Sequence, residues 1–125
     1  MREIIQNNDA QLEQPNQPVK IGEVSEPQIR AWKQVERVDD VFQVVLKDKQ
    51  GNRHYGYFRP ASRAALGAAQ MAGAGGNRVS FWEIIAENCW LGGSNVILSS
   101  DYLFGGLMTL LAELYEAADG EIAKL

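Results

Sequence analysis

The sequence has little of the chemistry that metal sites, disulfides and most active sites require. Its 125 residues include one cysteine, Cys89, and one histidine, His54. A single cysteine excludes a disulfide within the chain, and a single histidine excludes a histidine-rich metal site. Because so few side chains remain for nucleophilic or acid–base catalysis, we interpret the chain as a non-enzymatic binding protein with no cofactor and no bound metal.

Long hydrophobic runs are also missing. The longest apolar stretch, residues 103–111, is much shorter than the roughly twenty residues that a membrane-spanning helix needs. Residues 1–5 lead directly into polar sequence, so no signal-peptide apolar region is recognisable there. We therefore expect a cytoplasmic protein that does not contact a membrane.

The composition that is present is that of one small globular domain. Hydrophobic residues make up 46% of the chain and charged residues 22%, which is enough to build a core without disulfides. Residues 6–17 differ, because they are rich in Asn and Gln and Leu12 is their only large apolar residue. Such a segment cannot bury enough surface to offset the entropy of ordering it. We predict a mobile polar arm at residues 1–22 and a single α+β domain at residues 23–125.

Charge is unevenly distributed along the chain. The net charge of −4 arises wholly from residues 99–125, whose only cation is Lys124. Residues 47–78 have a net positive charge, because Asp48 is the only acidic residue among several Lys and Arg residues. Opposite charges on one molecule favour head-to-tail self-association, so a homo-oligomer is one open possibility. A nucleic-acid-binding protein is normally basic overall, which argues against nucleic acid as the partner.

Hydrophobic periodicity and turn residues predict an α+β fold that is mainly α: one β-hairpin followed by three helices, with a short helix before the hairpin. Ser80 and Glu83 match a capping box for the second of the three helices, and Gly92 is expected to end it. The expected elements are a helix at residues 26–37, hairpin strands at 38–47 and 53–59, helices at 61–72 and 81–91, an extended link at 96–98, and a last helix that Ser99 or Ser100 caps and Gly120 ends.

The last helix and the helix before it are the sharpest binding candidates. The apolar positions between Phe104 and Ala118 recur with the spacing of one helix face. If the core cannot cover this face, the remainder forms a groove or a dimer surface. We predict that four residues contact a client or a second copy: Trp82, Trp90, Leu107 and Leu111. The alternative is that these side chains are simply core.

The hairpin carries a second set of candidates. We expect Arg59 to orient the hairpin against an acidic neighbour. Together with Arg53, Tyr55 and Tyr57 it also combines cations with aromatic rings, as single-stranded nucleic-acid platforms do. Alternating tyrosines are equally typical of a half-buried strand, and we favour that interpretation.

The remaining polar residues have structural explanations. Cys89 is surrounded by apolar neighbours near a helix end and is expected in the core. His54 lies in a strand without a metal-sharing neighbour, so we expect it on the surface or in a hydrogen-bonded pocket. Two carboxylate pairs are expected on solvated helix faces: Glu83 with Glu87, and Glu113 with Glu116.

The order of these elements resembles that of the small tail assembly chaperones encoded by long-tailed bacteriophages and prophages. The resemblance covers about residues 26–125. Its motifs are QIRAWK at 28–33, a hairpin that ends in YFRP at 57–60, SRAALGAA at 62–69, FWEIIAENCWLGG at 81–93, and a last helix that contains LMTLLAELYE before a final AKL.

This resemblance implies a function by binding. Such a chaperone keeps the long, amphipathic tape measure protein soluble in the cytoplasm of the host bacterium while the tail tube polymerises. The partner it implies is therefore the tape measure protein. Two alternatives stay open at this point: a structural component retained in a tail or another oligomer, and a small nucleic-acid-binding module.

Overall fold

Strand β4 (Arg53–Phe58) is the central strand of a sheet in the computed structural model, which describes residues 17–115 and 120–125. Strand β3 (Phe42–Lys47) pairs with β4 in antiparallel register along its whole length. The two strands form the predicted hairpin, and Gly51 adopts the positive φ of 86° that its turn requires.

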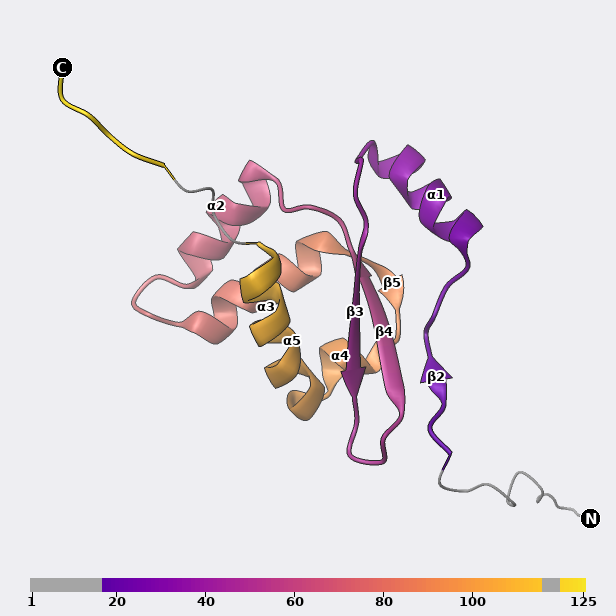
Figure 1. The fold of residues 1–125 in the computed structure, drawn as a ribbon. Helices are drawn as coiled ribbons and strands as arrows, with labels where there is room; N and C mark the ends of the chain where they lie inside the picture. The colour runs from indigo at the N-terminus through magenta and orange to yellow at the C-terminus, as the bar shows by residue number, and fades with distance from the viewer. Residues whose placement is uncertain (1–16, 116–119) are drawn as a thin grey trace, which may run out of the picture.

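The other edge of β4 is shared by two short strands. β2 (Lys20–Ile21) runs parallel to the first half of β4, and β5 (Trp90–Gly93) runs antiparallel to the second half. Figure 1 shows both strands on the side of β4 that faces away from β3. β4 is therefore hydrogen-bonded on both edges, which suits a strand that is buried from His54 to Phe58.

Helices cover both faces of this sheet. They are α1 (Glu26–Glu36), α2 (Arg63–Ala72), α3 (Arg78–Cys89), α4 (Val96–Ser99) and α5 (Asp101–Leu114). Figure 1 places α1 on one side of the sheet and α2, α3 and α5 on the other. Trp32 of α1 packs against Tyr57 in a tilted arrangement with ring centroids 5.6 Å apart. Because successive strand residues point to opposite faces, Phe58 enters the core on the other side.

The main core lies between the sheet and α2, α3, α4 and α5. Leu103, Leu107 and Leu111 supply one buried stripe of α5, at the i, i+4 spacing that the sequence predicted for this helix. The buried core residues are Val44, Phe58, Ala69, Ile85, Ala86, Cys89, Ile97, Leu103, Leu107 and Leu111.

The predicted fold class is confirmed: the protein is α+β and mainly α. The hairpin, the helix before it and the three long helices after it are all present. The structure adds β2 and β5 to the sheet and a short helix, α4, between α3 and α5. The link at residues 96–98, which was expected to be extended, is part of α4.

The boundaries of α3 differ from the prediction. Asn77 caps the helix, because its side chain accepts a hydrogen bond from the backbone N–H of Ser80. Ser80 is therefore inside the helix and is not its cap. The helix ends at Cys89, since Trp90 is extended and pairs with Phe58 of β4. The prediction for the last helix is confirmed at its start, where Ser100 accepts from the N–H of Leu103.

The start of the domain also differs from the prediction. Most of the expected polar arm, residues 1–16, lies outside the described residues. Its last part belongs to the sheet, because the backbone N–H of Arg53 donates to the Val19 carbonyl over 2.8 Å and Lys20 pairs with Arg53. Composition alone did not reveal this strand, since its partner is more than thirty positions away in the sequence.

Candidate functional site

A groove of about 600 Å³ lies between α3 and α5. We call it the α3–α5 groove. Its apolar walls come from Val79 and Ile84 of α3 and from Phe104 and Met108 of α5, and Leu98 of α4 adds to its lining. All five side chains are at least partly exposed. The groove therefore presents apolar surface that the domain itself does not cover.

The geometry of the two helices explains this exposure. On α5, the stripe at 103, 107 and 111 points into the core, so Phe104 and Met108 lie one position further round the helix. On α3, Ile85 and Ala86 face the core, which leaves Ile84 on the flank. The two flanks line the same groove because α3 and α5 are in contact with each other on one face of the sheet.

Carboxylates stand at the edge of the α3–α5 groove. Glu83 and Glu87 lie one helical turn apart on α3, and Asp101 is in the first turn of α5. All three are exposed, as the sequence indicated for the glutamates. None of them forms an ion pair with any residue in the described part of the chain. The groove is thus apolar at its centre and negatively charged at its rim.

Two of the predicted contact residues are not available to a partner. Leu107 and Leu111 are 0% exposed and lie in the core, so the prediction that they contact a client or a second copy is wrong. The periodicity identified the correct helix but not the exposed flank. The residues missed by this reasoning, Phe104 and Met108, belong to the same apolar pattern, and only the packing of α3 shows that they face outward.

The two tryptophans are half-buried and lie outside the groove lining. Trp82 packs edge-to-face on Phe81 with ring centroids 4.8 Å apart. Trp90 packs edge-to-face on Phe58 at 5.3 Å. Both contact the core.

Arg59 lies beside an acidic residue of another element. Its Nε is 3.5 Å from Oε1 of Glu36, at the end of α1. Its backbone carbonyl accepts a hydrogen bond from the Tyr115 hydroxyl, beyond the end of α5. Arg59 therefore connects the end of the hairpin with elements on both faces of the sheet.

The aromatic hairpin platform does not form on this fold. Tyr55 and Tyr57 are both buried, so their rings cannot stack on the bases of a nucleic acid. The Tyr57 hydroxyl is also occupied, because it donates to the Gln43 side chain and accepts from the backbone N–H of Val24. The sequence favoured a half-buried strand for these tyrosines. In the structure β4 is buried on both faces from His54 to Phe58.

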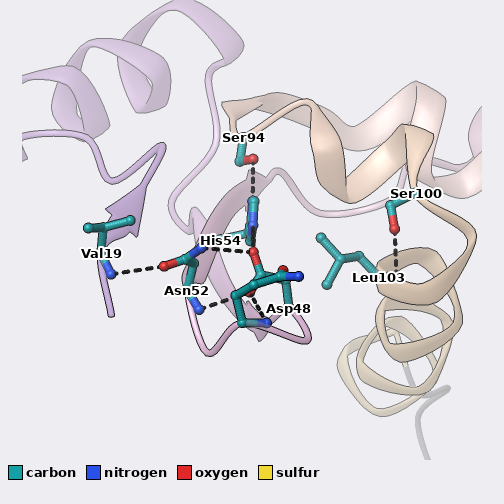
Figure 2. Close-up of polar contacts among 8 residues, drawn as sticks. Val19, Asp48, Asn52, His54, Ser94, Ser100 and Leu103 are labelled. Carbon is teal, nitrogen blue, oxygen red and sulfur yellow. Dashed lines mark hydrogen bonds and ion pairs between the residues drawn. The ribbon is translucent and has the colours of Figure 1, made fainter. Parts of the chain in front are cut away.

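His54 lies at the centre of a polar network that joins three parts of the chain (Figure 2). Its Nδ1 is 2.7 Å from the Ser94 hydroxyl, and its Nε2 is 2.9 Å from Oδ2 of Asp48. Since the Asp48 carboxylate can only accept, Nε2 of a neutral His54 donates to it and Nδ1 accepts from Ser94. The network links β4 to the hairpin turn and to the segment that follows β5.

The residue types in this network are those of a hydrolase triad, but the arrangement is closed. His54 is 3% and Ser94 is 4% exposed, so a substrate cannot reach the hydroxyl. Asp48 is the only one of the three whose side chain reaches the surface. We interpret the network as the hydrogen-bonded pocket that the sequence allowed for His54.

Asp48 also organises the hairpin turn. Its side chain accepts hydrogen bonds from the backbone N–H groups of Gln50 and Asn52, each over 2.9 Å. The hydrogen bond from His54, together with these backbone donors, holds the pKa of the Asp48 carboxyl below its ordinary value of 3.8.

The lowered pKa of Asp48 predicts a loss of stability in acid. A carboxyl whose pKa is lower in the folded than in the unfolded chain stabilises the fold above its ordinary pKa, and this contribution is lost as the pH falls through the folded value. We expect the free energy of unfolding of the Asp48→Asn variant to fall less than that of the parent between about pH 5 and about pH 3. Urea unfolding across this range measures it. The exposed Asp39→Asn variant is the control and should follow the parent; the same acid loss in D48N as in the parent would contradict the role of Asp48.

Cys89 is buried in the core, as predicted. Burial raises the pKa of its thiol, although Tyr115 and Arg59 act in the opposite direction. A buried, protonated thiol is a poor nucleophile, so Cys89 is a packing residue in this fold.

Within 17–115 and 120–125, no group of three His, Cys, Asp or Glu side chains is placed to hold a metal ion. The same part of the chain contains no helix with the length and hydropathy to cross a bilayer.

Comparison with protein-family models, curated proteins and solved structures gives no match for this chain.

Proposed function

We propose that this chain is a non-enzymatic tail assembly chaperone, which binds a helical segment of a tape measure protein and keeps it soluble. The observation that carries the proposal is the α3–α5 groove, with Ile84, Phe104 and Met108 partly exposed along its walls. The family part of the proposal rests on the sequence motifs between residues 26 and 125.

The groove suits a client that is itself amphipathic. A helix with one apolar face aggregates when that face meets water, and an apolar groove between two helices covers such a face. Burying one large apolar side chain contributes about 1.5–3 kcal/mol, against a cost of several kcal/mol for association. Two or three anchors in this groove therefore give reversible binding, which a chaperone that must release its client needs.

Co-expression with a segment of the tape measure protein from the same phage tests this proposal. We expect the parent chain to keep the segment soluble and to co-purify with it. Met108→Arg places a charge in the groove wall and should reduce the co-purified client by tenfold or more, since the loss of one anchor and the burial of a charge each cost more than about 1.4 kcal/mol.

The matched control is Val35→Arg, the same substitution at an α1 residue that is 75% exposed and outside the groove. This variant should retain the client at the level of the parent. Unchanged client solubility in the presence of the parent chain would overturn the proposal. Recovery of the chain from finished particles would instead identify a structural component.

A further inference from the structure

We infer that the α3–α5 groove selects a cationic amphipathic helix, with Lys or Arg residues on both sides of its apolar stripe. This inference rests on the proposed function and specifies the chemistry of the client segment. It is carried by two independent features of one surface: an apolar floor and walls, and a rim of acidic side chains.

The rim favours cations on both sides of a bound helix. Glu83 and Glu87 belong to the α3 wall, and Asp101 belongs to the start of the opposite wall. Among the described residues that line the groove there is no Lys or Arg. The two glutamates are four positions apart, which places their Cβ atoms roughly 6 Å from each other on one helix face. A ligand helix with cations at the same spacing can pair with both.

The walls favour a helix over an extended peptide. Most backbone N–H and C=O groups of α3 and α5 are paired within the helices, so the walls offer few partners to the backbone of a ligand. An extended peptide would leave its own backbone groups unpaired against apolar side chains. A helix pairs its backbone internally and presents only side chains.

The basic part of a second copy is a competing occupant, because residues 47–78 carry a net positive charge. Arg63 and Arg78, at the starts of α2 and α3, are both exposed. The cationic-helix proposal requires that the groove stays open in the isolated chain. Sedimentation of the chain alone distinguishes the two occupants, since only self-association depends on the concentration of the chain.

Two synthetic helical peptides test the charge preference directly. Both are about four turns long and carry the same leucine stripe, flanked by lysines in one and by glutamates in the other. We expect fluorescence anisotropy with the intact chain to show at least about tenfold tighter binding of the lysine peptide at low salt. The preference should shrink to within about threefold at 1 M salt, because exposed charge pairs are screened.

Reversing the charge of the rim tests whether the peptides bind in the α3–α5 groove. The double variant E83K/E87K is expected to invert the preference, so that the glutamate peptide binds more tightly. Its control is D39K/D40K, which changes the net charge equally at two exposed positions outside the groove lining and should keep the preference of the parent. Circular dichroism confirms that each variant is folded.

The possible outcomes separate this inference from the proposed function. Equal binding of the two peptides, binding of neither, or a preference that E83K/E87K leaves unchanged would each overturn the cationic-helix inference. So would a dimer of the isolated chain that E83K/E87K dissociates, because it would put a second copy in the groove. The proposed function fails on the client-solubility assay instead, so the two results can be told apart.

Discussion

Replacing Gly93 with alanine is expected to destabilise the fold by at least about 3 kcal/mol. Gly93 has a φ of +123°, which is a conformation that side-chain-bearing residues rarely adopt. An added Cβ would also lie 2.3 Å from the Tyr55 carbonyl oxygen and 3.0 Å from the Gly56 Cα. Both contacts are with the backbone of β4, so no side-chain rotation relieves them. The variant must either strain β5 or lose its pairing with β4.

Gly75→Ala is the matched control for this prediction. Gly75 also has a positive φ, +80°, but an added Cβ there meets nothing within 4 Å. The control therefore carries the backbone strain without the clash and should cost about 1 kcal/mol. Chemical unfolding of both variants measures the difference. If G93A proves as stable as G75A, β5 does not approach β4 as closely as the structure has it.

The second large effect is expected for Leu107→Ala. Leu107 is fully buried between α5 and the rest of the core, so its truncation removes buried apolar surface and leaves a cavity. Substitutions of this kind cost about 2–5 kcal/mol. We expect the folded fraction of this variant to bind the proposed client segment as well as the parent does, because the side chain does not line the groove.

Met108→Ala, one position along the helix, should show the opposite pattern. Met108 is only partly buried and lines the α3–α5 groove, so its truncation should cost about 1 kcal/mol of stability. Client binding should weaken instead. Urea unfolding and client titration of the two variants give a direct comparison. Similar stability losses in both, or a client defect in L107A with the fold intact, would contradict the orientation of α5.

Local patterns in the sequence were sufficient for the hairpin and for most helices. The alternation of Phe42, Val44 and Leu46 identifies β3, and Gly51 marks its turn, because both signals act between neighbouring residues. The cap at Ser100 was predictable for the same reason. Each of these features depends on interactions within a few positions of the chain.

The prediction for residues 90–93 was wrong because a distant partner decides their conformation. Trp90 and Leu91 continue the apolar sequence of α3, yet they form β5 because β4 has an edge available for pairing. The same edge orders Lys20 and Ile21, which the polar composition before them had assigned to an arm. A strand edge with unpaired backbone groups stabilises an extended segment that pairs with it. A local sequence pattern does not show whether such an edge is near, because the two segments are distant in the sequence.

For the candidate site too, some features follow from the sequence and others only from the tertiary structure. By itself, the sequence determined that this protein is an α+β domain with an apolar last helix, a shortage of catalytic side chains and exposed carboxylates on the helix before it. Only the tertiary structure decided that Leu107 and Leu111 are interior while Phe104 and Met108 form a groove with α3. The physical reason is that periodicity defines a helix face, whereas the neighbours packed against that face determine which of its residues remain in contact with water.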